Sequence, residues 1–485
     1  MFEKTHGFKE ALFVNGLDID YCYKINGKGY RVVELEDAKI NHLPGETQSF
    51  RFAGIEIKYG IASPWRYYMQ ARAIVWLIMK YRKSKEILRY AIKWGKVTKI
   101  GQESTEKYDE FGRAYFGPFL LGFTRWLYGE IKKQNLQKVL FFARDGWMME
   151  RAFQLIYRGD VEERYVYFSR KSIRQALLHQ CKGYEESLKY VSAEKYISFG
   201  GLLEYYGFDE HERNEISKIY SVALKKDFDV AVLASNTQIK TIYDDLSEII
   251  KKKSREQDKL LFQYLSQNEI SGKVGIVDIG WKGSMQYYLE TYLESHNMDV
   301  SLVGFYVGIL PKEILHGVTH GFLYDSSNLK LRKEVLCFAG GLERLFQSLE
   351  GSTYGYKEET GKIVPVLNAY EYADAPEIQK CIMELQKSAL EFVAENKNCV
   401  DDNKKMAYKL VRFGMSPTLK DVKLFSPFYN TDGTREYYIS QKAIYKYGLR
   451  EFMHALSSSP WKNGFLKSAF KIPFPYYWIY RMMKK

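Results

Sequence analysis

Two short sequences in the middle of the chain combine an aspartate with glycine and basic residues, and such a combination could hold a phosphate. One is FFARDGWMM, which contains Arg144, Asp145 and Gly146. Glycine permits a tight turn, and a helix that starts after the turn presents unpaired N–H groups to an anion. The other is IVDIGWKGSMQ, which contains Asp278, Gly280, Lys282, Gly283 and Ser284. We therefore treat Asp145 and Asp278 as candidate catalytic residues and their neighbours as candidate phosphate ligands.

A third sequence, YFSRK, places Ser169 and Arg170 after another apolar run. A turn of this kind between a strand and a helix often serves only to cap the helix, and one turn alone does not decide between capping and binding. Three basic or glycine-rich turns in one domain strengthen the expectation of a shared ligand site.

The N-terminal region contains a different set of polar residues. Asp18 and Asp20 lie in NGLDIDYC, and His42 lies in NHLPG after a predicted strand at 30–37. Side chains two residues apart point about 200° from one another on a helix, although both could line a cleft at a helix N-terminus. A carboxylate and a neutral imidazole could serve as a base and as ligands of Mg²⁺ or Mn²⁺. The alternative is that both aspartates are helix caps or solvated side chains.

The apolar patterns predict the elements that would position these residues. KVLFF, YVYF and KVGIV are each followed by a turn and a helical pattern, and VSLVGFYVGIL is a further strand sequence. Buried strands that alternate with helices indicate a parallel sheet, so the chain is predicted to be an α/β protein.

We expect three regions along the chain. Residues 1–100 contain helical and strand patterns and a long basic amphipathic helix at 63–96. Residues 106–330 form a Rossmann-like α/β domain with a helical insertion at about 181–270. Residues 331–485 are mainly helical and end in a basic aromatic tail.

The composition limits the class of protein. The 485 residues are 46% hydrophobic and 27% charged, as is typical of a folded globular chain. Five cysteines without a CxxC pair argue against a zinc site or a disulfide framework and favour the cytoplasm. No signal core is present at the start, and no apolar run approaches the roughly 18 residues of a membrane span. The net charge of +13 without a nucleic-acid motif favours phosphate or a membrane over nucleic acid as the partner.

The tail, SSSPWKNGFLKSAFKIPFPYYWIYRMMKK, is basic and aromatic and has no acidic residue. Such a segment suits peripheral contact with the inner face of the plasma membrane. It could equally be a C-terminal helix packed on the core of the protein.

The segment at 8–82 resembles the C-terminal part of family 2 GT-A glycosyltransferases, in particular the rhamnosyltransferase-like group. The matching residues are Asp18-Ile19-Asp20-Tyr21, His42-Leu43-Pro44-Gly45 and the sequence WRYYMQARAI. The resemblance implies that Asp18 is the base for an acceptor hydroxyl and that His42 is a metal ligand near the donor diphosphate. Lys24 stands where the family usually has Arg, which loses bidentate geometry.

The donor-binding half of these transferases, with its Asp-x-Asp, should precede this segment, where only Met1 to Gly7 stand. We therefore expect no sugar transfer by this segment alone.

The region at 108–450 resembles the domain that follows the haloacid-dehalogenase-type module in bacterial surface-polysaccharide proteins. The matching sequences are GPFLLGFTRWL, FFARDGWMM, VYFSRKSIRQA, IVDIGWKGSMQ and LERLFQSLEGSTYGY. The hydrolase module itself is absent, and Trp147 stands where a phosphatase would have a second acid after Asp145. The turn around Asp278 is also similar to the sugar-phosphate loop of phosphoribosyltransferases, which we rank lower.

Together these features predict a protein of bacterial capsule or surface-polysaccharide biosynthesis that is derived from a glycosyltransferase. Its α/β domain would bind or process a phosphorylated sugar, a sugar nucleotide or a carrier. Two alternatives stay open: a non-catalytic accessory or scaffold of a partner glycosyltransferase, and a truncated glycosyltransferase fusion. Whether the chain is an enzyme is left open as well.

Overall fold

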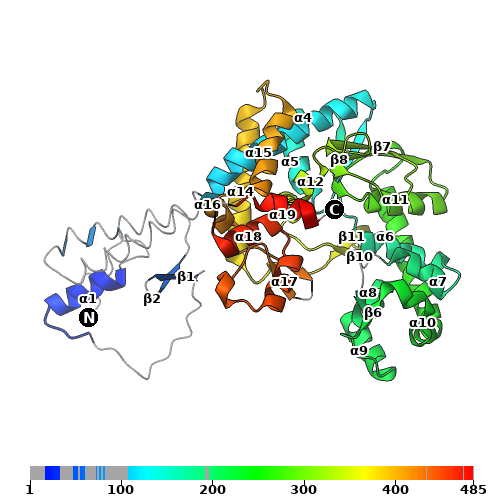
Figure 1. Cartoon of the computed structure of the whole chain (residues 1–485), viewed down its shortest axis with the longest axis horizontal. Coiled ribbons are helices and arrows are strands. Elements are labelled where there is room, and N and C mark those ends of the chain that lie inside the picture. Colours follow the sequence, from blue (N-terminus) through cyan, green and yellow to red (C-terminus); the bar gives the residue numbers. More distant parts are fainter. Residues whose placement is uncertain are drawn as a thin grey trace. The chain divides into compact units, whose positions relative to one another are not determined.

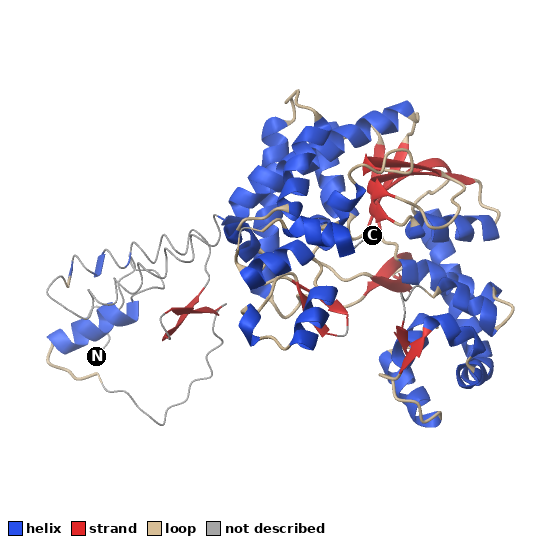
Figure 2. Cartoon of the chain, viewed as in Figure 1, coloured by secondary structure: helices blue, strands red, loops and turns tan. Residues whose placement is uncertain are grey.

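The computed structural model describes residues 17–32, 47–52, 55–60, 73, 76–77, 80–81, 107–191, 196–432, 434–472 and 474–483. The chain divides into two compact units. The first is Met1–Glu110 with Ala375–Glu384, and the second is Phe111–Asp374 with Leu385–Lys485. Figure 1 follows the chain from end to end, and Figure 2 marks its helices and strands.

The described part of the first unit contains a helix and a hairpin. Helix α1 is Leu17–Gly27, and strands β1 (Thr47–Phe52) and β2 (Ile55–Gly60) pair antiparallel. Within the predicted helix at 63–96, the described positions 73, 76–77 and 80 are helical. Residues 30–32 of the predicted strand at 30–37 are not in a strand, and its remainder lies outside the described residues.

The second unit is built on a five-stranded parallel sheet in the order β4-β3-β7-β8-β9. The strands are β3 (Lys138–Phe142), β4 (Glu162–Val166), β7 (Gly272–Trp281), β8 (Val300–Ile309) and β9 (Val318–Tyr324). The α/β prediction is therefore confirmed, and β3, β7 and β8 lie where the apolar runs placed them. Strand β4 is shifted: it starts three residues before the predicted run YVYF and ends two residues before the end of that run. Strand β9 was not predicted.

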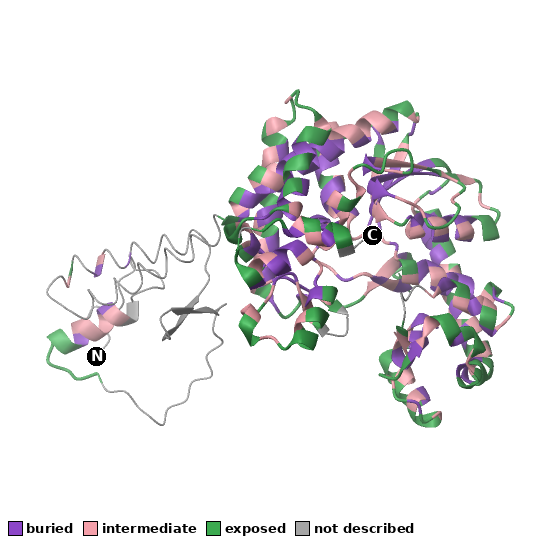
Figure 3. Ribbon diagram, viewed as in Figure 1, coloured by how far each residue is buried: buried purple, intermediate pink, exposed green. Residues whose placement is uncertain are grey.

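The middle strands are buried along most of their length (Figure 3). In β3 the residues from Val139 to Phe142 are all buried, and in β8 those from Leu302 to Ile309 are. Strands covered on both faces need continuous apolar runs. These segments were therefore recognisable as strands although apolar and polar residues do not alternate in them.

Three helices follow directly on three of the strands, as predicted. They are α5 (Gly146–Tyr157) after β3, α6 (Arg170–Leu177) after β4 and α11 (Ser284–Ser295) after β7. Gly146 lets α5 approach its strand, because a Cβ at this position would lie 2.9 Å from the carbonyl carbon of Phe141.

The predicted helical insertion lies between β4 and β7. Its long helix is α10 (Thr237–Gln267), and its other elements are α7 (Tyr184–Ser187), β5 (Tyr196–Ser198), α8 (Phe199–Tyr205), α9 (Glu210–Ile219) and β6 (Asp227–Asp229). The short antiparallel pair β5–β6 was not predicted.

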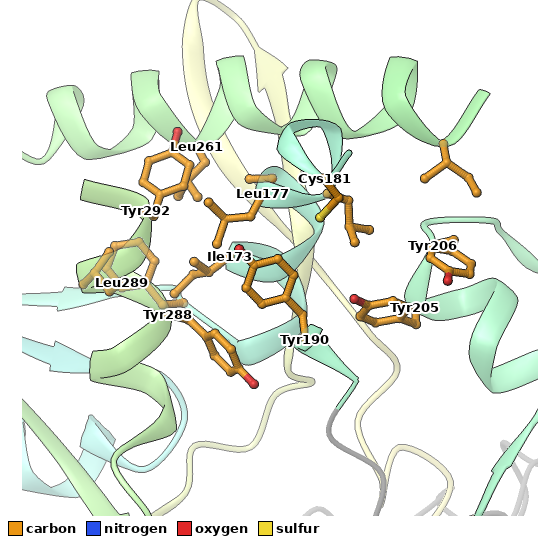
Figure 4. Close-up of a cluster of buried hydrophobic side chains, with 14 of the residues drawn as sticks. Ile173, Leu177, Cys181, Tyr190, Tyr205, Tyr206, Leu261, Tyr288, Leu289 and Tyr292 are labelled. Carbon is orange, nitrogen blue, oxygen red and sulfur yellow. The ribbon is translucent and has the colours of Figure 1, made fainter. Parts of the chain in front are cut away.

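A shared hydrophobic core joins this insertion to the sheet (Figure 4). Ile173 and Leu177 of α6 pack in one buried cluster with Leu261 of α10 and with Leu289 and Tyr292 of α11. Because α6 takes part in this cluster, the turn that precedes it is held in a defined position.

The remaining elements are mostly helices, with two hairpins that the sequence did not predict. They are α4 (Gly117–Lys133), α12 (Arg332–Leu336), α13 (Ala339–Phe346), β10 (Thr353–Glu359), β11 (Lys362–Leu367), α14 (Pro376–Asn396), α15 (Asn403–Met415), α16 (Leu419–Leu424), β12 (Tyr429–Asp432), β13 (Thr434–Tyr437), α17 (Leu449–Ser458), α18 (Lys462–Phe470) and α19 (Tyr476–Met483). Among the described helices, none is long and apolar enough to cross a membrane.

Candidate functional site

A cavity of about 410 Å³ lies at the carboxyl ends of the sheet strands in the second unit. Most of the residues that the sequence singled out in this region contribute to its wall. They are Arg144, Asp145, Ser169, Arg170, Asp278, Gly280, Lys282, Gly283 and Ser284. Gly146 starts α5 beside Asp145 and does not itself line the cavity.

The order of the strands explains why a cavity forms here. Strands β3 and β7 are neighbours, but the chain continues from β3 to β4 on one side and from β7 to β8 on the other. In parallel sheets the connections diverge at such a point and leave a crevice in which ligands bind. Asp145 follows β3 and Asp278 lies near the end of β7, so the two aspartates lie on the two sides of this crevice.

Three helices begin at the cavity, and each presents the positive end of its dipole there. Helix α5 starts after Asp145, α6 after Ser169 and α11 after Gly283. Unpaired N–H groups at helix N-termini favour bound anions. These helix ends therefore contribute a positive potential to the wall that does not depend on side chains.

Two glycines shape the turn before α11. Gly280 has a φ of 104°, and a Cβ there would lie 2.5 Å from the carbonyl oxygen of Gly308. Gly283 caps the helix with a φ of 71°. Both positions lie in the left-handed region that favours glycine, so the role predicted for these residues is a backbone role.

Ser169 uses its hydroxyl for capping. Its Oγ accepts a hydrogen bond from the backbone N–H of Ser172 at 2.9 Å and donates one to the carbonyl oxygen of Thr353 at 2.6 Å. This hydroxyl orients α6 at the cavity, which is the capping alternative that the sequence left open.

Three carboxylates share the cavity wall: Asp145, Asp278 and Glu343. Burial raises the pKa of Asp145 well above its usual range, and the carboxylates of Asp278 and Glu343 raise it further. Burial raises the pKa of Asp278 to about 6, although the backbone N–H of Ile279 acts in the opposite direction. Burial also raises the pKa of Glu343. The group therefore carries less negative charge at neutral pH than three solvated carboxylates would.

Asp145 is unusual within this group because one of its oxygens is unsatisfied. Its Oδ1 is buried and accepts no hydrogen bond from the described residues. Buried polar atoms are nearly always paired, so an unpaired carboxylate oxygen at a cavity wall is a candidate for contact with a ligand.

Glu343 comes from α13 and was not among the predicted site residues. Its Oε1 accepts a hydrogen bond from the indole Nε1 of Trp281 at 2.7 Å. Trp281 has a φ of 74°, in the left-handed region that a bulky residue seldom adopts. The only local signal for Glu343 was an acid within the apolar sequence LERLFQ.

The end of strand β7 differs from the prediction. The run KVGIV, followed by a turn, predicted a strand that ends near Asp278, but pairing with β8 continues through Gly280 opposite Gly308 to Trp281 opposite Ile309. The longer pairing is possible because the glycines let the two backbones approach each other.

The cations at the cavity differ in how they are engaged. Arg144 donates two hydrogen bonds to Glu371, from Nη1 at 2.6 Å and from Nη2 at 2.8 Å. Arg170 is exposed, and its guanidinium has no hydrogen-bond or ion-pair partner among the described residues. Lys282 is exposed on the opposite turn. Arg170 is therefore better placed than Arg144 to bind an anionic ligand.

The N-terminal candidates belong to the first unit, whereas the cavity is lined by the second unit. Asp18 and Asp20 lie in α1, and His42 lies outside the described residues. Asp20 is 1% exposed. Its carboxylate accepts hydrogen bonds from Lys80 Nζ and from the Tyr81 hydroxyl, both at 2.6 Å, and lies 3.1 Å from Lys24 Nζ.

These partners determine the ionisation of Asp20. Burial raises the pKa of this carboxyl, but the hydrogen bonds from Lys80, Tyr81 and Lys24 outweigh burial and lower it below its usual value. An ionised carboxylate with three partners is an anchor that ties α1 to the helical residues near position 80.

Within the described ranges, no group of three or more His, Cys, Asp or Glu side chains is arranged to hold a metal ion. The chain matches no protein-family model and shows no significant similarity to a curated protein.

Proposed function

We propose that this protein acts in bacterial surface-polysaccharide biosynthesis, where its second unit binds and processes a phosphorylated sugar, a sugar nucleotide or a phosphorylated carrier. The observation that carries this proposal is the cavity between β3 and β7, where three helix N-termini and Arg170 meet carboxylates with raised pKa values. In this proposal the α/β domain is Rossmann-like. The first unit derives from the C-terminal part of a GT-A glycosyltransferase, and the protein works in the cytoplasm.

The ligand phosphate would lie against the N-termini of α5 and α11. The backbone N–H groups there would donate to its oxygens, and Arg170 would neutralise its charge. Because the guanidinium of Arg144 is held by Glu371, Arg144 would shape the wall and would not bind the phosphate directly.

The carboxylates divide into a proton donor and a proton acceptor. With a pKa of about 6, Asp278 is mostly ionised at neutral pH and would accept the proton of an attacking hydroxyl. Burial and the neighbouring carboxylates favour the protonated form of Asp145, which would donate its proton to the leaving oxygen. Two acids whose environments separate their pKa values are the usual arrangement for acid–base catalysis.

The proposal includes a divalent metal such as Mg²⁺ or Mn²⁺ only because these ions prefer carboxylate oxygens, which the cavity wall provides. No three-ligand group among the described residues is arranged for such an ion, and neither proton transfer above uses one.

The binding test is calorimetric titration of the full chain with a hexose 1-phosphate, a nucleotide sugar, the free hexose and inorganic phosphate. We expect binding of the phosphorylated ligands and none of the free hexose. Arg170→Gln should weaken binding by about tenfold, because it removes a charged hydrogen bond. The matched control is Arg158→Gln, since Arg158 is exposed at the end of α5 and does not line the cavity. Equal affinity of the two variants would contradict the proposed binding mode.

The functional test is deletion of the gene, which should change the composition of the capsule or wall polysaccharide. Unchanged glycan would overturn the proposal. Complementation with Asp145→Ala or Asp278→Asn separates catalysis from the scaffold alternative. We expect both folded variants to fail, whereas full complementation by either would favour a non-catalytic accessory role.

A further inference from the structure

The C-terminal helix α19 is apolar on two opposite sides. Tyr476 and Tyr480 are buried, and Tyr476 packs in a cluster with Leu456 and Phe465. The other side carries Trp478, which is 57% exposed, and Met482, which is 47% exposed. Residues four apart lie on one helix face, so Trp478 and Met482 form an exposed apolar stripe. A surface helix of a globular protein normally has a polar outer face.

The apolar stripe continues in the residues before the helix. Phe470, the last residue of α18, is exposed, and so are Ile472 and Phe474, which precede α19. Single exposed apolar residues are common, but exposed apolar residues at alternate positions of one short segment mark an interaction surface.

The charge of this segment is of one sign. From Phe452 to the C-terminus the sequence has no Asp or Glu. Its basic residues are Lys462, Lys467, Lys471, Arg481, Lys484 and Lys485. Tryptophan and other apolar side chains interleaved with Lys and Arg are typical of helices that lie in the interface of an anionic membrane.

A second cavity, of about 340 Å³, lies beside α19. Tyr480 of α19 lines it together with Arg332 and Lys333 of α12 and Lys462 of α18. Lys462 Nζ donates to the carbonyl oxygens of Ser457 and Ser459 at 3.1 Å. The side chains of Arg332 and Lys333 have no hydrogen-bond or ion-pair partner among the described residues. The acid of α12, Glu334, does not line the cavity.

We propose that the apolar stripe and this basic cavity form one docking site for an anionic lipid bilayer. Trp478 and Met482 enter the boundary between headgroups and acyl chains, and Arg332 and Lys333 bind the phosphate of a lipid headgroup. The absence of acidic residues in this segment favours a uniformly anionic surface over a protein partner, whose interface would present charges of both signs. This inference is independent of the function proposed for the first cavity.

The test is flotation of the full chain with vesicles of phosphatidylcholine alone and of an equimolar mixture of phosphatidylcholine and phosphatidylglycerol. We expect binding to the mixed vesicles only. Trp478→Ser should weaken this binding by about tenfold or more, because a large apolar side chain no longer leaves water. Arg332→Glu with Lys333→Glu should weaken it by a similar factor, because two cations near the surface become anions.

Matched controls come from α10, which does not contribute to this site. Phe262→Ser removes an exposed aromatic residue, and Lys240→Glu with Lys252→Glu makes the same change of charge on exposed residues. Both controls should bind like the wild-type chain. Met482→Glu is a second change on the stripe and should also weaken binding to the mixed vesicles. Thermal unfolding is measured for every variant, and an unchanged unfolding temperature shows that a loss of binding is not a loss of folding.

Three outcomes would overturn the proposal. The first is equal binding to both kinds of vesicle, and the second is unchanged binding of the Trp478 and Met482 variants. The third is that the chain binds no vesicles, that light scattering shows it to be a dimer, and that Trp478→Ser dissociates this dimer. In the last case a second copy of this chain would cover the stripe.

Discussion

Asp20 in the first unit and Asp145 in the second are both aspartates that the sequence singled out, and burial acts to raise the pKa of both, yet they differ in the charged groups that surround them. Asp20 has Lys80, Tyr81 and Lys24 as partners, and its pKa is lowered. Asp145 has a buried oxygen without a partner, neighbours of its own charge, and a raised pKa. Partners, more than burial, therefore decide whether an aspartate anchors a fold or is available for a reaction.

The largest expected effect is on the first unit. Asp20→Ala leaves the cations of Lys80 and Lys24 and the Tyr81 hydroxyl without their shared acceptor, and we expect a loss of about 3 kcal/mol of stability. The measurement is amide hydrogen exchange in α1, which should become much faster. Asn26→Ala, a change at an exposed position of the same helix, is the control and should have little effect. If exchange in α1 is equally slow in both variants, Asp20 is not an anchor.

The second prediction concerns the sign of the pH dependence. A carboxyl with a lowered pKa adds stability above its ordinary pKa of 3.8, and this stability is lost as the pH falls through the lowered value. A carboxyl with a raised pKa does the reverse, because the native state holds its proton more tightly than the unfolded chain. Ionisation of Asp278 should therefore lower the free energy of unfolding as the pH rises from 3.8, the ordinary pKa of aspartate, through about 6.

The size of this cost is on the order of 3 kcal/mol, and Asp278→Asn should remove it. The measurement is hydrogen exchange of β7 amides in wild-type and variant chains between acidic and neutral pH. The difference between the two chains in β7 should grow as the pH rises, whereas α1, which keeps Asp20 in both chains, should exchange alike in both. A difference that stays constant across this range would show that Asp278 titrates normally.

The smallest effect is expected at Trp281. Trp281→Phe removes the hydrogen bond to Glu343, and we expect a loss of about 1 kcal/mol at neutral pH. The control is Trp147→Phe, since the indole N–H of Trp147 has no hydrogen-bond partner among the described residues. Denaturant unfolding of both variants gives the comparison. An equal loss in both would assign the effect to ring size and not to the hydrogen bond.

Local sequence patterns were sufficient for the elements of the cavity. An apolar run followed by a glycine or a cap predicted β3 with α5, β4 with α6, and β7 with α11. Because parallel strands end at one edge, the same patterns predicted that Asp145, Arg170 and Asp278 would meet there. The hairpins β10–β11 and β12–β13 were not predicted, because the stability of short antiparallel pairs depends more on contacts with the rest of the chain than on their own residues.

The partners of the charged residues could not be predicted in the same way. Glu371 lies more than two hundred residues from Arg144 in sequence. Its carboxylate accepts two hydrogen bonds from the guanidinium of Arg144, which is then not available to bind a ligand. Glu343 reaches the cavity from a helix on a distant segment, and Lys80 and Tyr81 reach Asp20 in the same way. Nothing near any of these residues in sequence indicates the pairing.

By itself, therefore, the sequence determined which segments become buried strands and which turns open onto helices, because periodicity and glycine act through neighbours in the chain. Only the tertiary structure decided which carboxylates are paired and which are crowded by like charges. The reason is that a pKa depends on charges and solvent within a few ångströms in space, and folding brings those groups together from segments that are far apart in sequence.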